Sequence, residues 1–430
     1  MCIRDSIYEV DPANNDKLTK VYDSVDVDGF RSLVKGNVFT STRAIGSFGN
    51  TLIAGDLKPT ADGKGKALLV ASKTPSDPNS YKVIADMASF DNLPAIHRQD
   101  VNGGGGIYQV QEFNGKLYVV VCTGDTSTLN EETGTMRSFA IYVGENKGDS
   151  TNKADWTWRP LVGDTAKGAK YYYGLDKSRV SAGACTLQVY GDHLYIGDYN
   201  DVSSALQGFV TKSNFVTQAT NLEQSVNLYR MDKNENMELV VGNSTKMFPN
   251  GSLSGLKSGF GRNENQYIWR MQVYDGKLYV GTFDTSSMLE CVGQFVNGNL
   301  LTRTPAQWKT QWEYLKTLMK ALQATDPDGN GNPDTLAQTI KFSYKFVFEN
   351  ITVSNIASAI RLLNYMRKAK QGFDLYVSED GVNFQTITVD GFGDPYNHGL
   401  RVFATTDQGL CLGTANPFYG TQVWIKRTDS

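Results

Sequence analysis

Apolar and polar residues alternate along five segments of the chain that share one template. In each segment an apolar strand is followed by a short polar turn and by a second apolar strand that ends near a small residue. Asn-Gly and Asp-Gly between alternating apolar residues are strong signals for a β-hairpin, so the pattern predicts one hairpin repeated five times. The segments are RAIGSFGNTLIAGDL from Arg43, IYQVQEFNGKLYVVVCTGD from Ile107, CTLQVYGDHLYIGDYND from Cys185, WRMQVYDGKLYVGTFD from Trp269 and RVFATTDQGLCLGTAN from Arg401.

Further strand-like pieces follow each hairpin. KALLVASK and YKVIADM follow the first hairpin, similar pairs follow the next three, and QVWIKR follows the fifth. The amino-terminal pieces IYEVD and LTKVYDS are interpreted as third and fourth strands that complete the fifth unit. Four strands per repeated unit are typical of a β-propeller blade. We therefore expect an all-β fold over residues 7–430, a β-propeller of five to six four-stranded blades whose ring is closed by its first and last strands.

The first six residues, Met-Cys-Ile-Arg-Asp-Ser, resemble the translated sequencing adaptor that begins many metagenomic reading frames. Residues 1–6 are therefore not expected to belong to the fold. We expect the natural protein to begin further upstream, with its signal peptide lost from this sequence.

A long insertion, residues 288–372, separates the second and third strands of the fourth unit. Apolar residues recur at helical spacing within 305–322 and 354–370, which predicts an α-helical insertion. These helices either pack on each other and on the neighbouring blade or cap a binding site. Long loops are commonly functional, so the insertion supports a functional role for the face of the propeller on which it emerges.

Within the insertion, DPDGNGNPD resembles thrombospondin-type and dockerin-like calcium loops. Its oxygen-bearing side chains alternate along the segment, at Asp326, Asp328, Asn330, Asn332 and Asp334. The resemblance implies a structural calcium ion. Ala337 stands where an EF-hand loop supplies its bidentate Glu, so the affinity is expected to be weak or another segment must donate an oxygen. A polar turn without a metal is the alternative.

The segment SEDGVNF, residues 378–384, resembles the Asp-box turn of sialidase-like (BNR-like) and other secreted propellers. The resemblance implies a structural hairpin turn and a secreted bacterial β-propeller. It implies no catalytic role.

Charge and composition narrow the functional classes. The 42 Lys and Arg residues nearly balance 45 Asp and Glu residues, giving a net charge of −3, so nucleic acid is an unfavoured partner. No apolar run is long enough to span a bilayer. Five Cys without C-x-x-C spacing indicate neither a zinc site nor a disulfide framework, and three His offer little for metal ligation.

Topology alone predicts a candidate binding face. In a propeller, the start of each first strand and the end of each second strand lie together, at the mouth of the central funnel. Asp and Asn also terminate strands in ordinary turns, which is the structural alternative for each of them. The ligand-binding residues predicted on this basis are Arg43, Asp56, Tyr108, Asp198, Trp269, Arg270, Asp284, His398, Arg401 and Asn416.

Two functions fit such a funnel. Aromatic residues could stack on sugar rings while Asp and Asn bind hydroxyls, which predicts an extracellular, monomeric binding module for a glycan or a protein partner. The alternative is a glycoside hydrolase or polysaccharide lyase, with paired carboxylates and with Arg43 and Arg401 clamping an anionic substrate such as a uronic or sialic acid. A scaffold whose funnel is plugged by the insertion is a third possibility. Carboxylates with perturbed pKa values would favour the enzyme.

Overall fold

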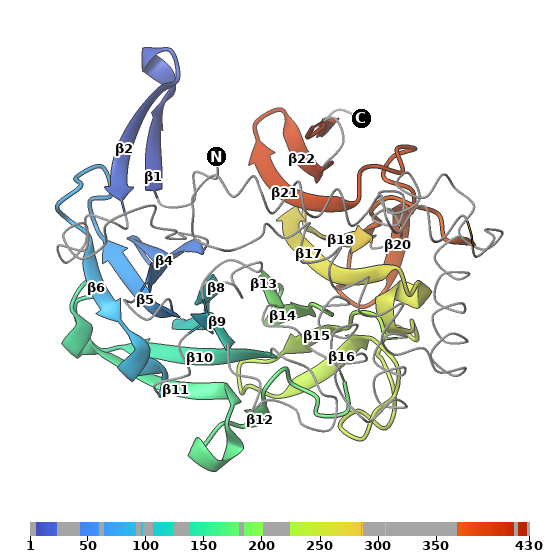
Figure 1. Ribbon diagram of the computed structural model, residues 1–430, viewed down its shortest axis with the longest axis horizontal. Coiled ribbons are helices and arrows are strands. Elements are labelled where there is room, and N and C mark those ends of the chain that lie inside the picture. The colour runs from blue at the N-terminus through green and yellow to red at the C-terminus, as the bar shows by residue number, and fades with distance from the viewer. Residues whose placement is uncertain are drawn as a thin grey trace. The chain divides into compact units, whose positions relative to one another are not determined.

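The fold is described from a computed structural model (Figure 1). The described residues are 6–23, 44–59, 64–91, 96–97, 106–123, 138–179, 185–200, 224–284, 286, 306, 368–416 and 420–427. Over these ranges the chain is all-β, and its helical elements are short 3-10 turns. They are η1 (Pro12–Asn14), η3 (Met87–Phe90), η5 (Lys153–Asp155), η6 (Thr165–Lys167) and η7 (Ser258–Gly261).

All five predicted hairpins are present as antiparallel strand pairs. Two of their turns have both central residues at positive φ, with Asn114 and Gly115 at 50° and 68° and Asp275 and Gly276 at 51° and 66°. Such turns match the right-handed twist of the strands that they join. The pairs are β3 (Ile45–Phe48) with β4 (Thr51–Pro59), β8 (Ile107–Phe113) with β9 (Lys116–Thr123), β13 (Cys185–Tyr190) with β14 (His193–Asp198), β17 (Asn265–Tyr274) with β18 (Lys277–Asp284), and β21 (Gly399–Thr406) with β22 (Gly409–Ala415).

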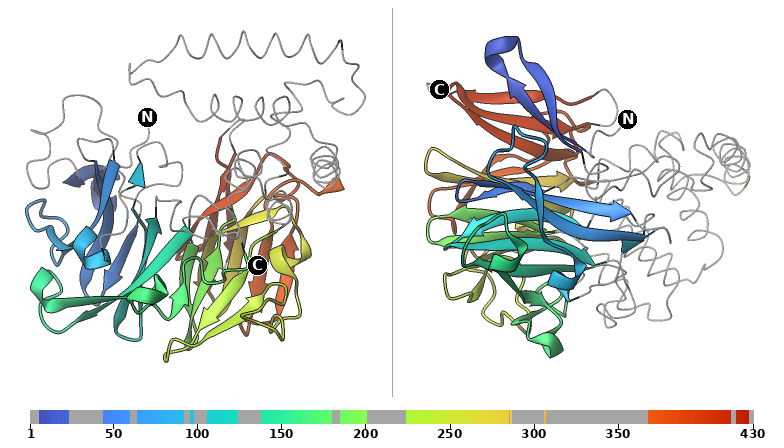
Figure 2. Two further views of the ribbon diagram at one scale, coloured as in Figure 1. Left: turned by 60° about the horizontal axis from the view of Figure 1, so that its bottom comes forward. Right: turned by 90° about the vertical axis from the view of Figure 1, so that its left-hand side faces the viewer.

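The strands that follow each hairpin extend it into a sheet, as the sequence predicts (Figures 1 and 2). The first and second sheets have five strands each and the third has four, whereas β17 to β23 form one seven-stranded sheet. Its first four strands in the chain are here called the fourth sheet and its last three the fifth sheet. One bridge, Phe283 with Gly399, joins the fourth sheet to the fifth. The added strands are β5 (Lys64–Ser72) and β6 (Lys82–Ala85), β10 (Ser138–Asn146) and β11 (Trp156–Gly163), β15 (Leu228–Met231) and β16 (Met237–Val241), β19 (Leu375–Ser378) and β20 (Phe384–Thr388), and β23 (Val423–Arg427), with short β7 (Ile96–His97) and β12 (Tyr171–Tyr172) paired to β5 and β11.

The amino-terminal strands form a sheet of their own. β1 (Ser6–Asp11) pairs with β2 (Lys17–Asp23), and β23 pairs with β22. The expected pairing of the first and last strands is thus not among the strand pairs that the described residues form. Nor is the expected α-helical insertion supported as an element. Most of residues 288–372 lie outside the described part of the chain, and the described remainder contributes only the single helical residues Ala306 and Lys368.

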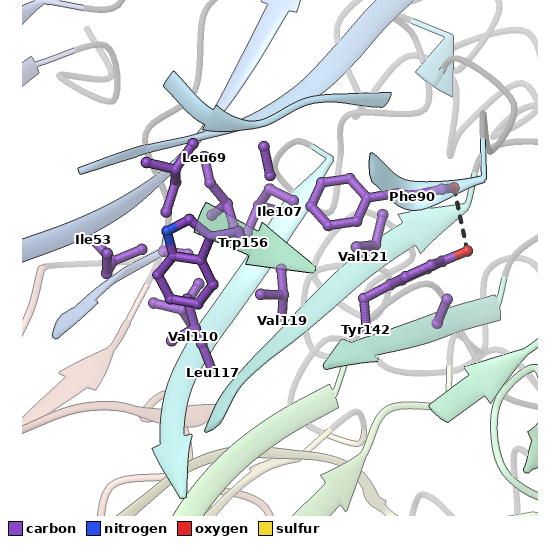
Figure 3. Close-up of a cluster of buried hydrophobic side chains, with 14 of the residues drawn as sticks. Ile53, Leu69, Phe90, Ile107, Val110, Leu117, Val119, Val121, Tyr142 and Trp156 are labelled. Atoms are coloured by element: carbon purple, nitrogen blue, oxygen red, sulfur yellow. Dashed lines mark hydrogen bonds between the residues drawn. The ribbon is translucent and has the colours of Figure 1, made fainter. Parts of the chain in front are cut away.

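The chain divides into two compact units, each considered by itself. Unit 1 comprises Met1–Tyr199 with Tyr229–Glu238, and unit 2 comprises Asn200–Leu228 with Leu239–Ser430. In unit 1 the largest core lies between the first two sheets (Figure 3). There Ile53 and Leu69 from one sheet pack with Ile107 and Val119 from the next.

Two polar side chains inside this unit 1 core are hydrogen-bonded to backbone carbonyls. The Tyr142 hydroxyl donates a hydrogen bond of 3.2 Å to the Phe90 carbonyl (Figure 3), and the Trp156 indole donates one of 3.0 Å to the Ser150 carbonyl. In unit 2 the corresponding core joins the fourth and fifth sheets through Tyr279, Phe373, Leu375, Leu400, Leu410 and Leu412. Each core therefore consists of apolar side chains from two consecutive sheets, which it holds together.

The turn between the third and fourth strands carries a capping Asp in four sheets. The carboxylates of Asp77, Asp149, Asp232 and Asp380 each accept the backbone N–H two residues further on, at 2.8–3.0 Å. At the predicted Asp-box turn, Asp380 also accepts the Asn383 N–H at 2.7 Å. These hydrogen bonds hold the pKa of Asp380 well below its usual range. The Asp-box resemblance thus marks one of four related turns.

Within the described ranges, no helix combines the length and the apolar character needed to cross a membrane.

Candidate functional site

Glycine allows the second strand of one sheet to lie close to the first strand of the next sheet within each unit. In unit 1, a Cβ on Gly55 would be 2.4 Å from the Ile107 side chain. In unit 2, a Cβ on Gly281 would be 2.5 Å from the Leu400 side chain. Gly55 and Gly281 hold equivalent positions within the second strands β4 and β18. The small residue that recurs in the sequence template therefore leaves room for an aliphatic side chain of the next first strand.

A β-bulge follows each of these two aliphatic residues. The register of β8 skips Tyr108, that of β17 skips Trp269, and that of β21 skips Arg401. These three residues therefore hold equivalent positions in three sheets, and all three were predicted as ligand-binding residues. Bulges commonly re-aim a side chain beside a functional site. The repeated bulge therefore marks the same position in the first strands of three sheets.

Trp269 is the centre of an aromatic cluster in unit 2, which we call the Trp269 cluster: Tyr267, Trp269, Phe283, His398 and Arg401. The indole meets Phe283 edge-on with centroids 5.2 Å apart and lies beside His398 at 6.1 Å. The guanidinium carbon of Arg401 is 5.3 Å from the centroid of the Trp269 ring, in cation–π contact. Trp269, Phe283 and His398 are partly exposed and Arg401 is exposed. The structure thus brings together three predicted residues from two sheets.

His398 is held in its neutral form by its surroundings. Burial, together with the positive charge of Arg401, lowers its pKa to about 4. Its Nδ1 atom is buried and has no hydrogen-bond partner among the described residues. A neutral imidazole can both donate and accept a hydrogen bond, so His398 is suited to a hydroxyl group.

Asp284 anchors this end of β18. Its N–H donates to the His398 carbonyl at 2.7 Å, and its carboxylate accepts the Ser286 and Gly372 N–H groups at 2.7 and 2.6 Å. The side chain is fully buried, and burial raises its pKa to about 7. Its predicted role as a ligand contact stays a prediction.

Two further predicted residues are neighbours of cluster residues in the sequence or through a hydrogen bond: Arg270 follows Trp269, and Asn416 contacts Asn397, which precedes His398. Arg270 follows the bulge on β17 and is exposed. Asn416 is nearly buried, and its amide donates to the Asn397 side chain at 3.2 Å. Arg270 is thus available to a ligand, whereas the Asn416 amide already has a partner.

A second group of charges in unit 2 was missed by sequence reasoning. The Arg262 guanidinium forms ion pairs with Glu264 at 2.7 Å and with Asp374 at 2.9 Å. The Asp374 carboxylate also accepts hydrogen bonds from Asn265 at 2.6 Å and from Tyr376 at 2.5 Å. Burial raises the pKa of Asp374 to about 6. The sequence signal that could have indicated this group is Asp374 itself, which stands among the apolar residues of FDLYV. A carboxylate in a buried strand is rarely without a partner, so a cation was to be expected beside it.

A strained turn adjoins this group. Phe260 has φ of +60°, which is unfavourable for a residue with a bulky side chain, and its ring stacks on Tyr376 with centroids 4.0 Å apart. Such strain often accompanies functional sites.

In unit 1, two of the predicted residues are largely buried. Asp198 lies 3.5 Å from the buried Arg179 guanidinium, a partner that the sequence did not identify. Tyr108 is 7% exposed. Arg43 lies outside the described residues, and of Asp56 only the backbone, in β4, is described. Their predicted roles stay predictions.

The proposed calcium ligands at Asp326, Asp328, Asn330, Asn332 and Asp334 also lie outside the described residues. Elsewhere in the described chain, no group of three His, Cys, Asp or Glu side chains is arranged to hold a metal ion.

No family model matches the sequence, and no curated protein matches it. Among solved structures, the chain is similar to α-L-arabinofuranosidase from Lactobacillus brevis, with 10% identity over 89% of this chain and 90% of that one, at a TM-score of 0.33. It is similar to the endo-arabinase of Bacteroides thetaiotaomicron, with 12% identity over 89% and 92% and a TM-score of 0.33. It is also similar to the GH43_1 enzyme from Xanthomonas citri, with 11% identity over 57% and 67% and a TM-score of 0.33. At such scores, fold and function must be argued from this chain's own residues.

Proposed function

We propose that this chain is a β-propeller whose repeated first strands present a carbohydrate-binding face. Five hairpin-led sheets follow one another along the chain, and neighbouring first strands lie close together within each unit. These are the features of radially repeated blades. On this basis the bulge residues face the mouth of the funnel.

The Trp269 cluster carries the proposal. The partly exposed aromatic side chains offer an apolar surface, and the neighbouring guanidinium and neutral imidazole offer hydrogen-bonding groups. A sugar ring needs both. The apolar C–H face of a pyranose ring can pack on the indole or Phe283, because these rings expose apolar area. Its hydroxyl groups can accept from Arg401 and exchange hydrogen bonds with His398.

A panel of soluble polysaccharides tests the binding proposal by affinity electrophoresis or calorimetry. Trp269→Ala is expected to reduce the affinity for the bound glycan by tenfold or more, since a buried or stacked aromatic anchor contributes strongly to binding. Trp424→Ala is the matched control, because Trp424 is a partly exposed indole on β23. Equal loss of affinity in both variants, or no loss in either, would contradict the assignment.

Glycoside hydrolysis is the second candidate, favoured by the two carboxyl groups with raised pKa values. Asp284 and Asp374, with pKa values of about 7 and about 6, retain protons at a pH where ordinary carboxyl groups are ionised. A protonated carboxyl group is what a glycosidase needs to protonate its leaving group. Both side chains are fully buried, so substrate access would require neighbouring segments to move.

Product release separates the two functions. Reducing sugars released from any bound polysaccharide, and lost in Asp284→Asn or Asp374→Asn but kept in Asp407→Asn, would make the chain a hydrolase. Asp407 is a suitable control because it is exposed in the β21–β22 turn. Binding without new products would leave the binding module as the function.

The calcium site at 326–334, secretion, the monomeric state and a protein partner remain proposals. The calcium proposal is tested by melting temperature with calcium and with chelator, in the unchanged chain and in Asp328→Asn. A calcium-dependent rise that the variant lacks would support it, and equal melting under both conditions would oppose it.

A further inference from the structure

We propose that the chain forms an intramolecular ester between Thr282 and Asn265. In this cross-link the Oγ1 atom of Thr282 is bonded to the Cγ atom of Asn265, and the amide nitrogen has left as ammonia. The bond joins strands β17 and β18 covalently. It is a modification of the chain itself and does not depend on glycan binding.

The first support is the contact between the two reacting groups. The Thr282 hydroxyl donates a hydrogen bond of 2.7 Å to the Asn265 side-chain oxygen, so it lies beside the carbonyl group whose carbon it attacks. Thr282 and Asn265 belong to β18 and β17, which are paired, and the pairing holds both groups in place. Groups held in contact react far more readily than free groups, because the entropy of bringing them together has already been lost.

The second support is the orientation of the Asn265 amide. Its Nδ2 atom donates to the Gly259 carbonyl at 3.0 Å and to the Asp374 carboxyl group at 2.6 Å. Because both N–H groups are used in this way, the amide oxygen is the atom that faces the Thr282 hydroxyl. The attacking alcohol and an acid for the departing nitrogen therefore contact opposite ends of one amide.

The third support is the acid beside the nitrogen. Burial raises the pKa of Asp374 to about 6, so part of the population carries a proton near neutral pH. Arg262 at 2.9 Å and the Tyr376 hydroxyl at 2.5 Å hold the Oδ2 atom in place. The Oδ1 atom is buried and has no hydrogen-bond partner among the described residues, which leaves it to carry the proton. A positioned carboxyl group can protonate a leaving group.

The fourth support is the exclusion of water. Asn265, Thr282 and Asp374 are each 0% exposed. Water competes with an alcohol for the amide carbon and hydrolyses an ester once it has formed. A site without water therefore favours the ester over the hydrolysed side chain.

The reaction balances without a co-reactant. The bond between Thr282 Oγ1 and Asn265 Cγ forms while the hydroxyl proton passes to the amide oxygen, which gives a tetrahedral intermediate. Asp374 then protonates the nitrogen, the C–N bond breaks and ammonia leaves. The remaining hydroxyl proton returns to the Asp374 carboxylate as the C=O bond re-forms. An alcohol and an amide become an ester and ammonia, and nothing is oxidised or reduced.

Intact-mass spectrometry of the purified chain is the first test. We expect a mass lower than that of the sequence by one ammonia molecule. Trypsin cuts after Arg270 and Lys277, which lie between the two residues. The tryptic peptides 263–270 and 278–303 should therefore stay joined, and mild alkali should separate them by hydrolysing the ester.

Four variants assign the reacting groups. Thr282→Val removes the nucleophile and Asp374→Asn removes the acid, so both should have the full sequence mass and two separate peptides. Thr282→Ser keeps a hydroxyl group and should keep the cross-link. Thr388→Val is the matched control, because Thr388 is a buried threonine of the same sheet whose hydroxyl donates to the Asp390 carboxylate. Cooperative thermal unfolding shows that each variant is folded.

The outcomes are distinct. Full sequence mass in the folded, unchanged chain would overturn the proposal. Loss of ammonia that persists in Thr282→Val, with the two peptides separate, would identify a succinimide at Asn265 and overturn it as well. A cross-link that persists in Asp374→Asn would overturn the role of Asp374 as the acid. None of these results bears on the carbohydrate-binding function, which Trp269→Ala tests separately.

Discussion

Gly399 lies against the indole ring of Trp269 so closely that a Cβ on this glycine would be 2.1 Å from the ring carbon Cζ3. The two residues come from the first strands of adjacent sheets, β21 and β17. The bare backbone of Gly399 therefore provides the space in which the Trp269 ring lies.

Gly399→Ala is expected to displace the Trp269 ring. Overpacking of this kind typically costs about 1–3 kcal/mol, and glycan binding should weaken together with stability. Urea unfolding and the binding assay provide the two measurements. Gly413→Ala is the control, because its nearest neighbour would be 3.5 Å from the new Cβ, an ordinary contact. Similar effects of the two substitutions would show that Trp269 does not depend on Gly399.

The hairpins were predictable because their signal is local. Alternation of apolar residues and the Asn114–Gly115 and Asp275–Gly276 turns each lie within a few residues, and the observed strands follow them. The bulges were not predictable, because a single extra residue at Trp269 or Arg401 leaves the alternation almost unchanged. Only the pairing with the second strand reveals the shift in register.

Asp374 should make unfolding depend on pH. Its pKa is about 6 in the folded chain and close to the ordinary value of 3.8 when unfolded, so between these values the folded state alone holds the proton. The resulting stabilisation is complete below pH 3.8 and is lost as pH rises through 6, at up to about 1.4 kcal/mol per pH unit.

Asp374→Asn should remove this dependence. Its amide oxygen can take the place of the Oδ2 atom that accepts from Asn265 and Tyr376. Urea unfolding between pH 4 and 7 should therefore give a flatter profile for the variant. Parallel profiles for the two proteins would contradict the raised pKa.

His398 should affect the pH dependence of stability in the direction opposite to that of Asp374. Its pKa is lowered to about 4, so below pH 6.5 the unfolded chain gains a proton that the folded chain does not. Stability due to His398 is present above pH 6.5 and is lost as pH falls through 4. NMR titration of the His Cε1–H signals, assigned with His398→Gln, should show its midpoint well below 6. Arg401→Gln should move that midpoint upward, and a midpoint near 6.5 in the unchanged chain would refute the assignment.

The Asp380 turn should contribute measurably to stability. Asp380→Ala removes the acceptor of the Val382 and Asn383 N–H groups, and losing a capping carboxylate typically costs about 1 kcal/mol. Asp407→Ala, in another hairpin turn, should change the free energy of unfolding by less than about 0.5 kcal/mol. Denaturant midpoints give both values, and equal midpoints would mean that the Asp380 hydrogen bonds add nothing.

The candidate site was only partly predictable. Trp269, His398 and Arg401 could be placed on one face because strand order alone puts them there. The ion pairs of Arg262 with Glu264 and Asp374, and of Arg179 with Asp198, could not. Arg262 and Asp374 come from chain segments separated by the long insertion, and no local pattern relates residues that meet only after the sheets have assembled.

The bulge shared by β8, β17 and β21 presents a phenol, an indole and a guanidinium from the same backbone position. The same register shift thus accommodates a Tyr, a Trp and an Arg at equivalent positions of three strands. A chain built in this way can acquire a new specificity through single amino-acid exchanges at these positions while the sheets stay intact. Repetition of such a unit therefore supplies both a fold and a set of equivalent positions at which the side chains differ.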